Sequence, residues 1–255
     1  MIRRDRRRQW PVAVIIGAAL AATSCSVAMG TPVSLVCPAQ PEIGYLADDV
    51  SATARSAGIM TERRRAIAAF LTATASCNGH AKVVAFTSSA AATRTLLDRD
   101  LVPGGATDVA HRRRVPKLIE AATREVDTEL ERALVDLPSD GTDVLAQLQL
   151  AAEYQSQVGA NRPLVVEILT DGLNTVGIDL NRDSLTSATA IALADGAVLP
   201  ALPGASVTFA GIGKMAGPLP PSSFVDSLKS FYAKTCQRTQ ADCRIVTDLA
   251  TGMNQ

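Results

Sequence analysis

The chain has 255 residues, 47% of them hydrophobic, with 25 basic and 25 acidic side chains. This length and apolar content suffice for one hydrophobic core. The first 24 residues hold five of the basic side chains and one of the acidic ones, so the remainder carries 20 positive and 24 negative charges. An acidic remainder gives no electrostatic reason to expect binding to nucleic acid.

Residues 1–24 have the layout of a secretory signal peptide. A basic start at 1–8 precedes an apolar stretch at 11–23, and small residues follow. Cys25 ends the run Leu-Ala-Ala-Thr-Ser-Cys, which resembles a bacterial lipobox, where the signal is cut before a cysteine that then carries a lipid. We therefore predict a lipid-anchored protein of a bacterial cell envelope, lipidated at Cys25, with a tether over residues 25–41.

Two other fates of the N-terminal segment stay open. Residues 10–30 carry no charge and are about long enough to cross a bilayer as an uncleaved anchor. Cleavage followed by release is the third form. All three place the rest of the chain outside the cytoplasm, and the first two attach it to the membrane.

The four other cysteines agree with export. An even number of cysteines in an exported domain suggests disulfides, and four allow three pairings. We favour Cys236–Cys243, which closes a short loop and leaves Cys37–Cys77; four buried thiols are the alternative. The sequence has no Cys-x-x-Cys and only two histidines, which argues against a zinc site built from Cys and His.

Apolar runs alternate with stretches whose apolar residues recur at helical spacing. Strands are expected, in chain order, at residues 43–47, 82–87, 94–102, 163–169, 205–212 and 243–247. Helices are expected at residues 54–76, 109–137, 144–157, 182–193 and 222–234. The charged run Glu-Arg-Arg-Arg at 62–65 is expected to form a solvated face of the first helix.

This alternation predicts an α/β fold: a doubly wound, Rossmann-like, mostly parallel sheet of about six strands flanked by helices. The domain is expected to span residues 42–250, with a helical insertion around 103–138 and a tail at 251–255. The near-continuous apolar run at 163–169 predicts a central strand that is buried on both faces. Ligands of such sheets bind at the carboxyl ends of the strands.

Oxygen-bearing side chains follow the predicted strands in a fixed order. Asp-Val-Ser-Ala-Thr occupies residues 49–53 after the first strand, Gly-Thr-Asp occupies 141–143 before a helix, and Thr-Asp-Gly occupies 170–172 after the central strand. Gly-Ile-Gly at 211–213 ends a later strand. Carboxylates and hydroxyls are hard ligands that suit Mg²⁺ or Mn²⁺ rather than zinc or copper.

The ordered set resembles a von Willebrand factor type A-like domain, over roughly residues 42–250. In that family these segments form a metal-ion-dependent adhesion site. The resemblance implies that Ser51 and Thr53 ligate the ion directly and that Asp49 ligates it or holds its waters. It also implies that Thr142 ligates in one state of the site and that Asp171 acts mainly through water.

Several of these residues have a simpler explanation. Ser51, Thr53 and Thr142 stand where helix-capping residues stand, and an N-cap needs no metal. Asp143 can be a first-turn acid favoured by the helix dipole. One departure from the family's pattern is Asp48, an acid where an apolar residue is usual.

The function that follows is divalent-cation-dependent binding of a protein ligand that presents a carboxylate, without catalysis. One alternative is a metal-dependent phosphatase or other hydrolase that uses Asp48 or Asp49 as its nucleophile. That chemistry wants a second Asp two residues after the nucleophile, and here positions 50 and 51 are Val and Ser. The other alternative is a structural envelope protein whose site has lost its metal.

Overall fold

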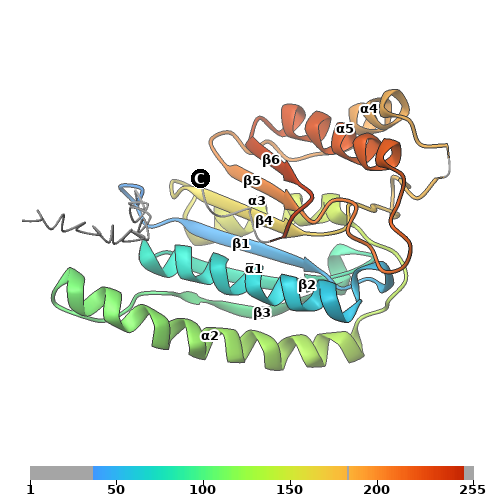
Figure 1. Cartoon of the computed structure of the whole chain (residues 1–255). Helices are drawn as coiled ribbons and strands as arrows, with labels where there is room; N and C mark the ends of the chain where they lie inside the picture. Colours follow the sequence, from blue (N-terminus) through green and yellow to red (C-terminus); the bar gives the residue numbers. More distant parts are fainter. Residues whose placement is uncertain (1–36, 183, 250–255) are drawn as a thin grey trace, which may run out of the picture. The chain divides into compact units, whose positions relative to one another are not determined.

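The computed structural model describes residues 37–182 and 184–249, and its centre is a six-stranded sheet with the order β3-β2-β1-β4-β5-β6 (Figure 1). The strands are β1 (Ile43–Asp49), β2 (His80–Phe86), β3 (Thr93–Asp100), β4 (Leu164–Leu169), β5 (Ser206–Ala210) and β6 (Asp242–Val246). Neighbouring strands are parallel, except that the edge strand β3 runs antiparallel to β2. The predicted α/β fold with a mostly parallel sheet of about six strands is confirmed.

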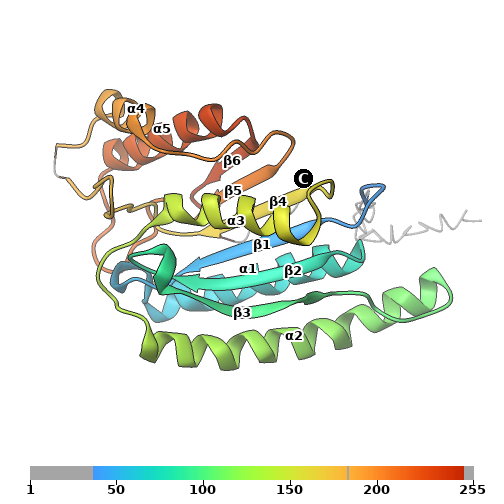
Figure 2. The same ribbon diagram turned by 180° about the vertical axis from the view of Figure 1, so that it is seen from behind.

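Helices cover both faces of the sheet (Figures 1 and 2). They are α1 (Ala57–Ser76), α2 (Asp108–Asp136), α3 (Val144–Gly159), α4 (Ser187–Gly196) and α5 (Ser222–Thr239). α1 and α2 pack on one face, and α3, α4 and α5 on the other. In β1, Tyr45 and Ala47 belong to one core and Leu46 to the other, because successive side chains of a strand point to opposite faces.

The helical segment expected around 103–138 is α2, which forms part of the core. Its buried residues recur at helical spacing: Val115, Ile119, Ala122, Val126, Leu130 and Ala133. They pack in the same hydrophobic cluster as α1 and the adjacent strands. α2 is therefore one of the two helices that cover this face of the sheet.

The helix expected at 182–193 begins later, at Ser187. The hydroxyl of Thr186 accepts a hydrogen bond from the backbone N–H of Thr189 at 3.2 Å, so Thr186 is the N-cap. An N-cap has extended rather than helical backbone, which ends the loop and starts the helix at that point.

Among the described residues, no helix has the length and hydropathy needed to cross a membrane.

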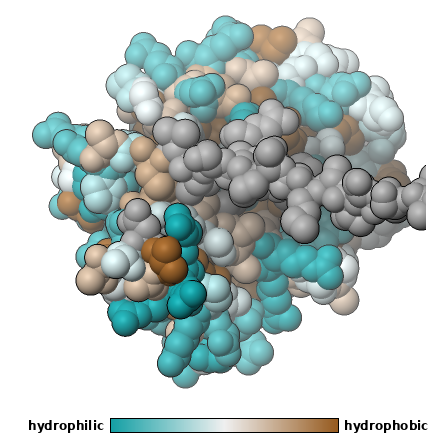
Figure 3. Space-filling view, turned by 60° about the vertical axis from the view of Figure 1, so that its left-hand side comes forward, coloured by the Kyte–Doolittle hydropathy of each residue, from teal (hydrophilic) through white to brown (hydrophobic). Residues whose placement is uncertain are grey.

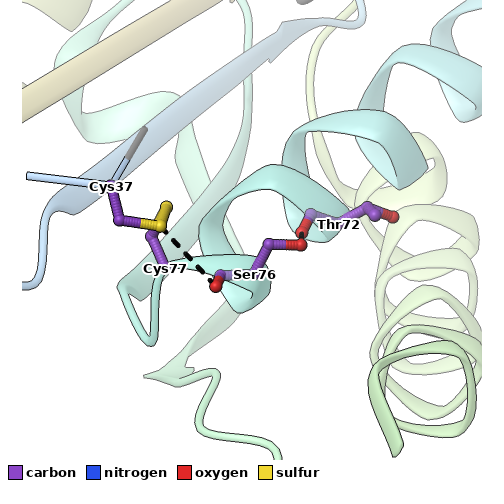
Figure 4. The surroundings of a disulfide bond; sticks show 4 residues. All are labelled: Cys37, Thr72, Ser76 and Cys77. Atoms are coloured by element: carbon purple, nitrogen blue, oxygen red, sulfur yellow. Dashed lines mark hydrogen bonds between the residues drawn. A yellow bond between two sulfur atoms is a disulfide. The ribbon is translucent and has the colours of Figure 1, made fainter. Parts of the chain in front are cut away.

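Two disulfides tie segments of the domain together. Cys236 bonds Cys243 across the end of α5 and the start of β6, and Cys37 bonds Cys77. Figure 4 shows that the second bond attaches the chain entering the domain to the end of α1, where Cys37 Sγ also lies 3.7 Å from the carbonyl oxygen of Ser76. Both pairings are those favoured from the sequence.

Candidate metal centre

The carboxyl ends of β1 and β4 lie side by side at one edge of the sheet. The register pairs Asp48 with Leu169, so Asp49, the last residue of β1, stands beside Thr170. The hydroxyl of Thr170 donates to Asp49 Oδ2 at 2.9 Å, and Asp171 follows directly. Asp49 and Asp171 are both fully buried. The structure thus brings together two carboxylates that are 122 positions apart in the sequence.

The loop after β1 holds the two hydroxyls of the predicted site. The backbone N–H of Ser51 donates to Asp49 Oδ1 at 2.9 Å, which folds the loop back over the carboxylate. Ser51 Oγ and Thr53 Oγ1 lie 3.4 Å apart. Ser51 occupies the N-cap position of a 3₁₀ helix at Ala52–Ala54, but its side chain makes no capping hydrogen bond. Helix capping therefore does not explain Ser51, and its hydroxyl remains available to a ligand.

Thr142 precedes α3 at the same edge, and it is not the cap of that helix. The N-cap is Asp143, whose carboxylate accepts from the N–H of Ala146 at 3.1 Å. Thr142 is buried, and no hydrogen bond joins its hydroxyl to Asp49 or Asp171 in the described structure. The loop before α3 is nevertheless fastened to the loop after β1, because Ala52 N donates to Ser139 O at 2.9 Å.

The two carboxylates of the site repel each other in a desolvated environment. Burial, and then the negative charge of Asp49, raise the pKa of Asp171 to about 6, while the Thr53 hydroxyl acts in the opposite direction. Asp171 Oδ1 accepts from the N–H of Leu173 at 2.9 Å, but Oδ2 is buried with no hydrogen-bond partner. A buried acceptor without a donor is costly, and a divalent cation would satisfy it and offset the repulsion.

The donor set fits a hard divalent ion. Within the described part of the chain, no group of three or more His, Cys, Asp and Glu side chains is arranged to hold a metal. A site with two carboxylates supplemented by hydroxyls does not need such a group, and Mg²⁺ typically keeps several waters beside one or two carboxylates. Asp49, Ser51, Thr53, Thr142 and Asp171 are the residues that would hold the ion.

Thr170 is a site residue that the sequence analysis did not select. Its hydroxyl donates to Asp49 and accepts from the N–H of Gly172 at 3.1 Å. Thr170 therefore connects the carboxylate of Asp49 to the backbone that follows Asp171. Gly172 has a φ of +88°, a backbone conformation that residues with a side chain rarely adopt. The signal in the sequence was the hydroxyl directly before Asp171.

Asp48 and Arg63 form a buried ion pair behind the site. Arg63 Nη1 lies 2.9 Å from Asp48 Oδ1, and Arg63 also donates to the carbonyl oxygen of Asp49. Burial raises the pKa of Asp48 to about 6, and Arg63 acts against that rise. The prediction that residues 62–65 form a solvated helix face is wrong for Arg63, which is 1% exposed.

A hollow adjoins the site at the loop after β5. The N–H of Gly213 donates to the carbonyl oxygen of Asp171 at 2.8 Å, and the N–H of Ala216 donates to that of Thr53 at 2.6 Å. The hollow has a volume of about 380 Å³, and Ile212, Leu219 and Val225 line it together with charged and polar groups. An apolar depression therefore begins next to residues of the candidate metal centre.

The fold and the position of these segments can be compared with the family resemblance noted in the sequence. The sheet is six-stranded and mostly parallel with five flanking helices, and the oxygen-bearing segments meet at the carboxyl ends of its strands. This arrangement is the one expected of a von Willebrand factor type A-like domain. No protein-family model and no curated protein matches this sequence.

Several solved structures are similar to this chain. VWA2, a paralogue of ArnB from Sulfolobus acidocaldarius, is 10% identical with a TM-score of 0.41 over 82% of this chain and 42% of that one. The pilus adhesin SpaC of Lactobacillus rhamnosus GG is 13% identical with a TM-score of 0.45, over 82% of this chain and 28% of the adhesin. Manganese-loaded TRAP protein of Plasmodium vivax is 15% identical with a TM-score of 0.38, over 76% and 73%. This chain thus spans less than half of VWA2 and SpaC.

Proposed function

We propose that this protein is a divalent-cation-dependent binding module, exported to the bacterial cell envelope, which holds Mg²⁺ or Mn²⁺ and engages a protein that presents a carboxylate. The observation that carries the proposal is the buried, unpartnered Oδ2 of Asp171 beside Asp49. A fold that keeps two desolvated carboxylates together and leaves one acceptor unpaired is expected to gain stability from a cation.

The ligand chemistry explains why the ion would bind a partner. Ser51, Thr53 and Thr142 contribute neutral hydroxyls, so Asp49 and Asp171 are the only anionic groups among the proposed ligands. Mg²⁺ also exchanges bound water for an oxygen anion when its protein ligands leave positions open. A carboxylate of a partner would then complete the coordination, while an apolar side chain beside it could enter the hollow lined by Leu219 and Val225.

Export and attachment form the second part of the proposal. The two disulfides are compatible with an oxidising compartment. The signal peptide, the lipidation of Cys25 and the tether as far as residue 36 fall outside the described residues, so they rest on the sequence. An uncleaved anchor and release after cleavage are the other outcomes.

A hydrolase with Asp48 as nucleophile is disfavoured by the position of that side chain. Asp48 is fully buried against α1 and paired with Arg63, so no substrate can reach it without breaking the pair. Asp49 is the remaining candidate, and it is also fully buried. A binding role requires only that the ion be accessible to a partner.

Calorimetric titration with MgCl₂ and MnCl₂ tests the proposal. The protein is residues 25–255, the chain expected after export, with Cys25→Ser so that no lipid is attached. The wild type is compared with Asp49→Ala, with Ser51→Ala, and with Asp140→Ala, which removes an exposed carboxylate from the neighbouring loop. We expect the wild type and Asp140→Ala to bind the ion, and the other two variants to show no heat of binding.

Near-ultraviolet circular dichroism confirms that the variants are folded. Equal binding by all four proteins would mean that the site is misassigned, and no binding by any would favour the metal-free structural alternative. Hydrolysis of p-nitrophenyl phosphate with Mg²⁺, lost in Asp49→Asn, would overturn a pure binding role.

A further inference from the structure

α2 divides into two parts that differ in how their charges are compensated. Beyond Lys117, its side chains take part in five ion pairs, two within the helix and three with α1 or β3. Before that point lies a basic cluster that takes no part in the ion pairs formed among the described side chains of this helix and its neighbours. The cluster consists of Arg112, Arg113, Arg114 and Lys117, all exposed.

This arrangement is unfavourable for the isolated domain. Arg113 and Lys117 are four residues apart on one helix, a spacing at which like charges repel. The chain without its first 24 residues is acidic, with 24 negative against 20 positive charges. Four cations within six residues therefore stand out against the rest of the domain and are available to an external anion.

The basic cluster lies at the end of the domain where the chain enters. Cys37 and the start of β1 are at that end, and Figures 1 and 2 show the first turns of α2 there too. The link is direct, since Leu101 N, at the exit of β3, donates to the carbonyl oxygen of Gly79 at 2.9 Å. The candidate metal centre is at the opposite edge, where the parallel strands end.

Two acidic side chains at this end have partners on β2. Asp98 accepts from Lys82, and the two ring nitrogens of His80 lie 2.9 Å from Asp98 and 2.8 Å from Asp100. Apolar side chains instead accompany the cluster, with Val102 56% and Val109 51% exposed. Figure 3 turns this end towards the viewer and shows hydrophilic residues interspersed with hydrophobic ones.

We propose that the basic cluster, with Val102 and Val109, is a membrane-contact surface that binds anionic phospholipid headgroups. Basic side chains interspersed with apolar ones are the composition that binds an anionic interface. The proposal rests on the membrane tether of the proposed function: twelve residues from Cys25 to Cys37 reach at most about 40 Å. Such a short tether keeps the surface at a high effective concentration beside the bilayer and adds to the affinity that the cluster has by itself.

The contact would orient the domain. With the basic cluster on the headgroups, the candidate metal centre faces away from the membrane, towards a partner.

Vesicle cosedimentation tests the proposal with residues 25–255 carrying Cys25→Ser, in EDTA. The vesicles contain phosphatidylcholine alone, or with phosphatidylglycerol as about a third of the lipid. Arg113→Gln/Arg114→Gln is compared with Arg124→Gln/Arg132→Gln, which removes the same charge from the ion-paired part of the same helix. We expect the wild type to bind only the anionic vesicles and the first variant to bind about 20- to 30-fold more weakly. The second variant should remain within about twofold of the wild type, because its arginines lie away from the proposed contact.

Three results would overturn the proposal. Equal losses in both variants would indicate a general charge effect, and equal binding to neutral vesicles would exclude headgroup charge. Binding to soluble heparin without binding to vesicles would identify a polyanionic polymer as the partner. Because the assay contains no metal, the same result is expected for Asp49→Ala, so failure of the metal site leaves this test unaffected.

Discussion

Arg63 Nη1 and Asp48 Oδ1 lie 2.9 Å apart in the core, and the same guanidinium group donates to the carbonyl oxygen of Asp49. The pair joins α1 to β1 directly behind the candidate metal centre. Asp48, the departure from the family's pattern, is thus compensated by a basic residue 15 positions later in the chain. The pair explains how a strand can carry two consecutive acids into the interior.

Removing one partner of this pair should destabilise the domain strongly. Arg63→Met leaves Asp48 buried without its cation, and we expect a loss of about 3 to 5 kcal/mol in the free energy of unfolding. Replacing both partners, in Asp48→Val/Arg63→Met, should recover most of that loss, since apolar residues of similar size often replace a buried pair at little cost. Denaturant unfolding measures all three proteins, and a double variant no more stable than Arg63→Met would contradict the pairing.

Thr142 and Asp143 are neighbours with different expected roles. Asp143→Ala removes the N-cap of α3 and should cost about 1 kcal/mol of stability, with little effect on the affinity for Mg²⁺. Thr142→Ala removes a hydroxyl that caps no helix, so it should weaken Mg²⁺ or Mn²⁺ binding with little loss of stability. Thermal unfolding and calorimetry on both variants separate the two effects. Loss of stability in Thr142→Ala together with loss of metal binding in Asp143→Ala would contradict the roles assigned to these two residues.

Glu167 should make the stability of the domain depend on pH. It is 4% exposed in β4, and its Oε1 has no hydrogen-bond partner. Burial raises its pKa to about 7, against the opposing effect of Arg244. The folded state therefore keeps the proton that the unfolded state loses near pH 4.3. The stability of the folded state that depends on this protonated side chain is fully present below about pH 4 and is lost as the pH rises to about 7.

Glu167→Gln removes that titration. Its unfolding free energy should exceed that of the wild type by roughly 2 to 4 kcal/mol at about pH 8, and the difference should shrink towards about pH 4. Urea unfolding across this range is the measurement, with the difference between the two proteins cancelling the titration of other groups. A difference that is constant with pH would show that Glu167 is not protonated in the folded state.

The two disulfides should contribute unequally. They span 40 and 7 residues, and in the chain-entropy model the longer loop stabilises more, by about 1.5 kcal/mol. Cys37→Ala/Cys77→Ala should therefore unfold at lower denaturant than Cys236→Ala/Cys243→Ala. Equal midpoints would indicate that strain or residual structure in the unfolded chain outweighs loop entropy.

Sequence reasoning succeeded where the signal is local. The strand at Leu164–Leu169 and the helix at Ala57–Ser76 were predicted within a few residues, because period and apolar content reflect the faces that each element buries. The motifs after the first and the central strand were expected at one edge of the sheet, and Asp49 and Asp171 meet there because parallel strands bring their carboxyl ends together. Both disulfide pairings followed from the number and spacing of the cysteines.

The errors occurred where a distant residue decides the local structure. The first strand was predicted to end at Ala47, before the acids, yet β1 continues to Asp49 because Arg63 compensates Asp48 inside the core. The same contact turned an expected solvated arginine into a buried one. The type of a charged residue does not indicate which residue it will pair with in the folded protein.

The sequence by itself determined the class of the fold, the order of the motifs and the oxygen chemistry of the candidate centre, because these depend on residue type and periodicity. Only the tertiary structure decided that Thr170 aligns Asp49 and that Asp143, not Thr142, caps α3. It also brought the basic cluster to the end where the chain enters the domain. Thr170 and Asp49 are far apart in the sequence, and Thr142 and Asp143 are neighbours of similar chemistry. In both cases only the packing of the folded chain decides which contacts each residue makes.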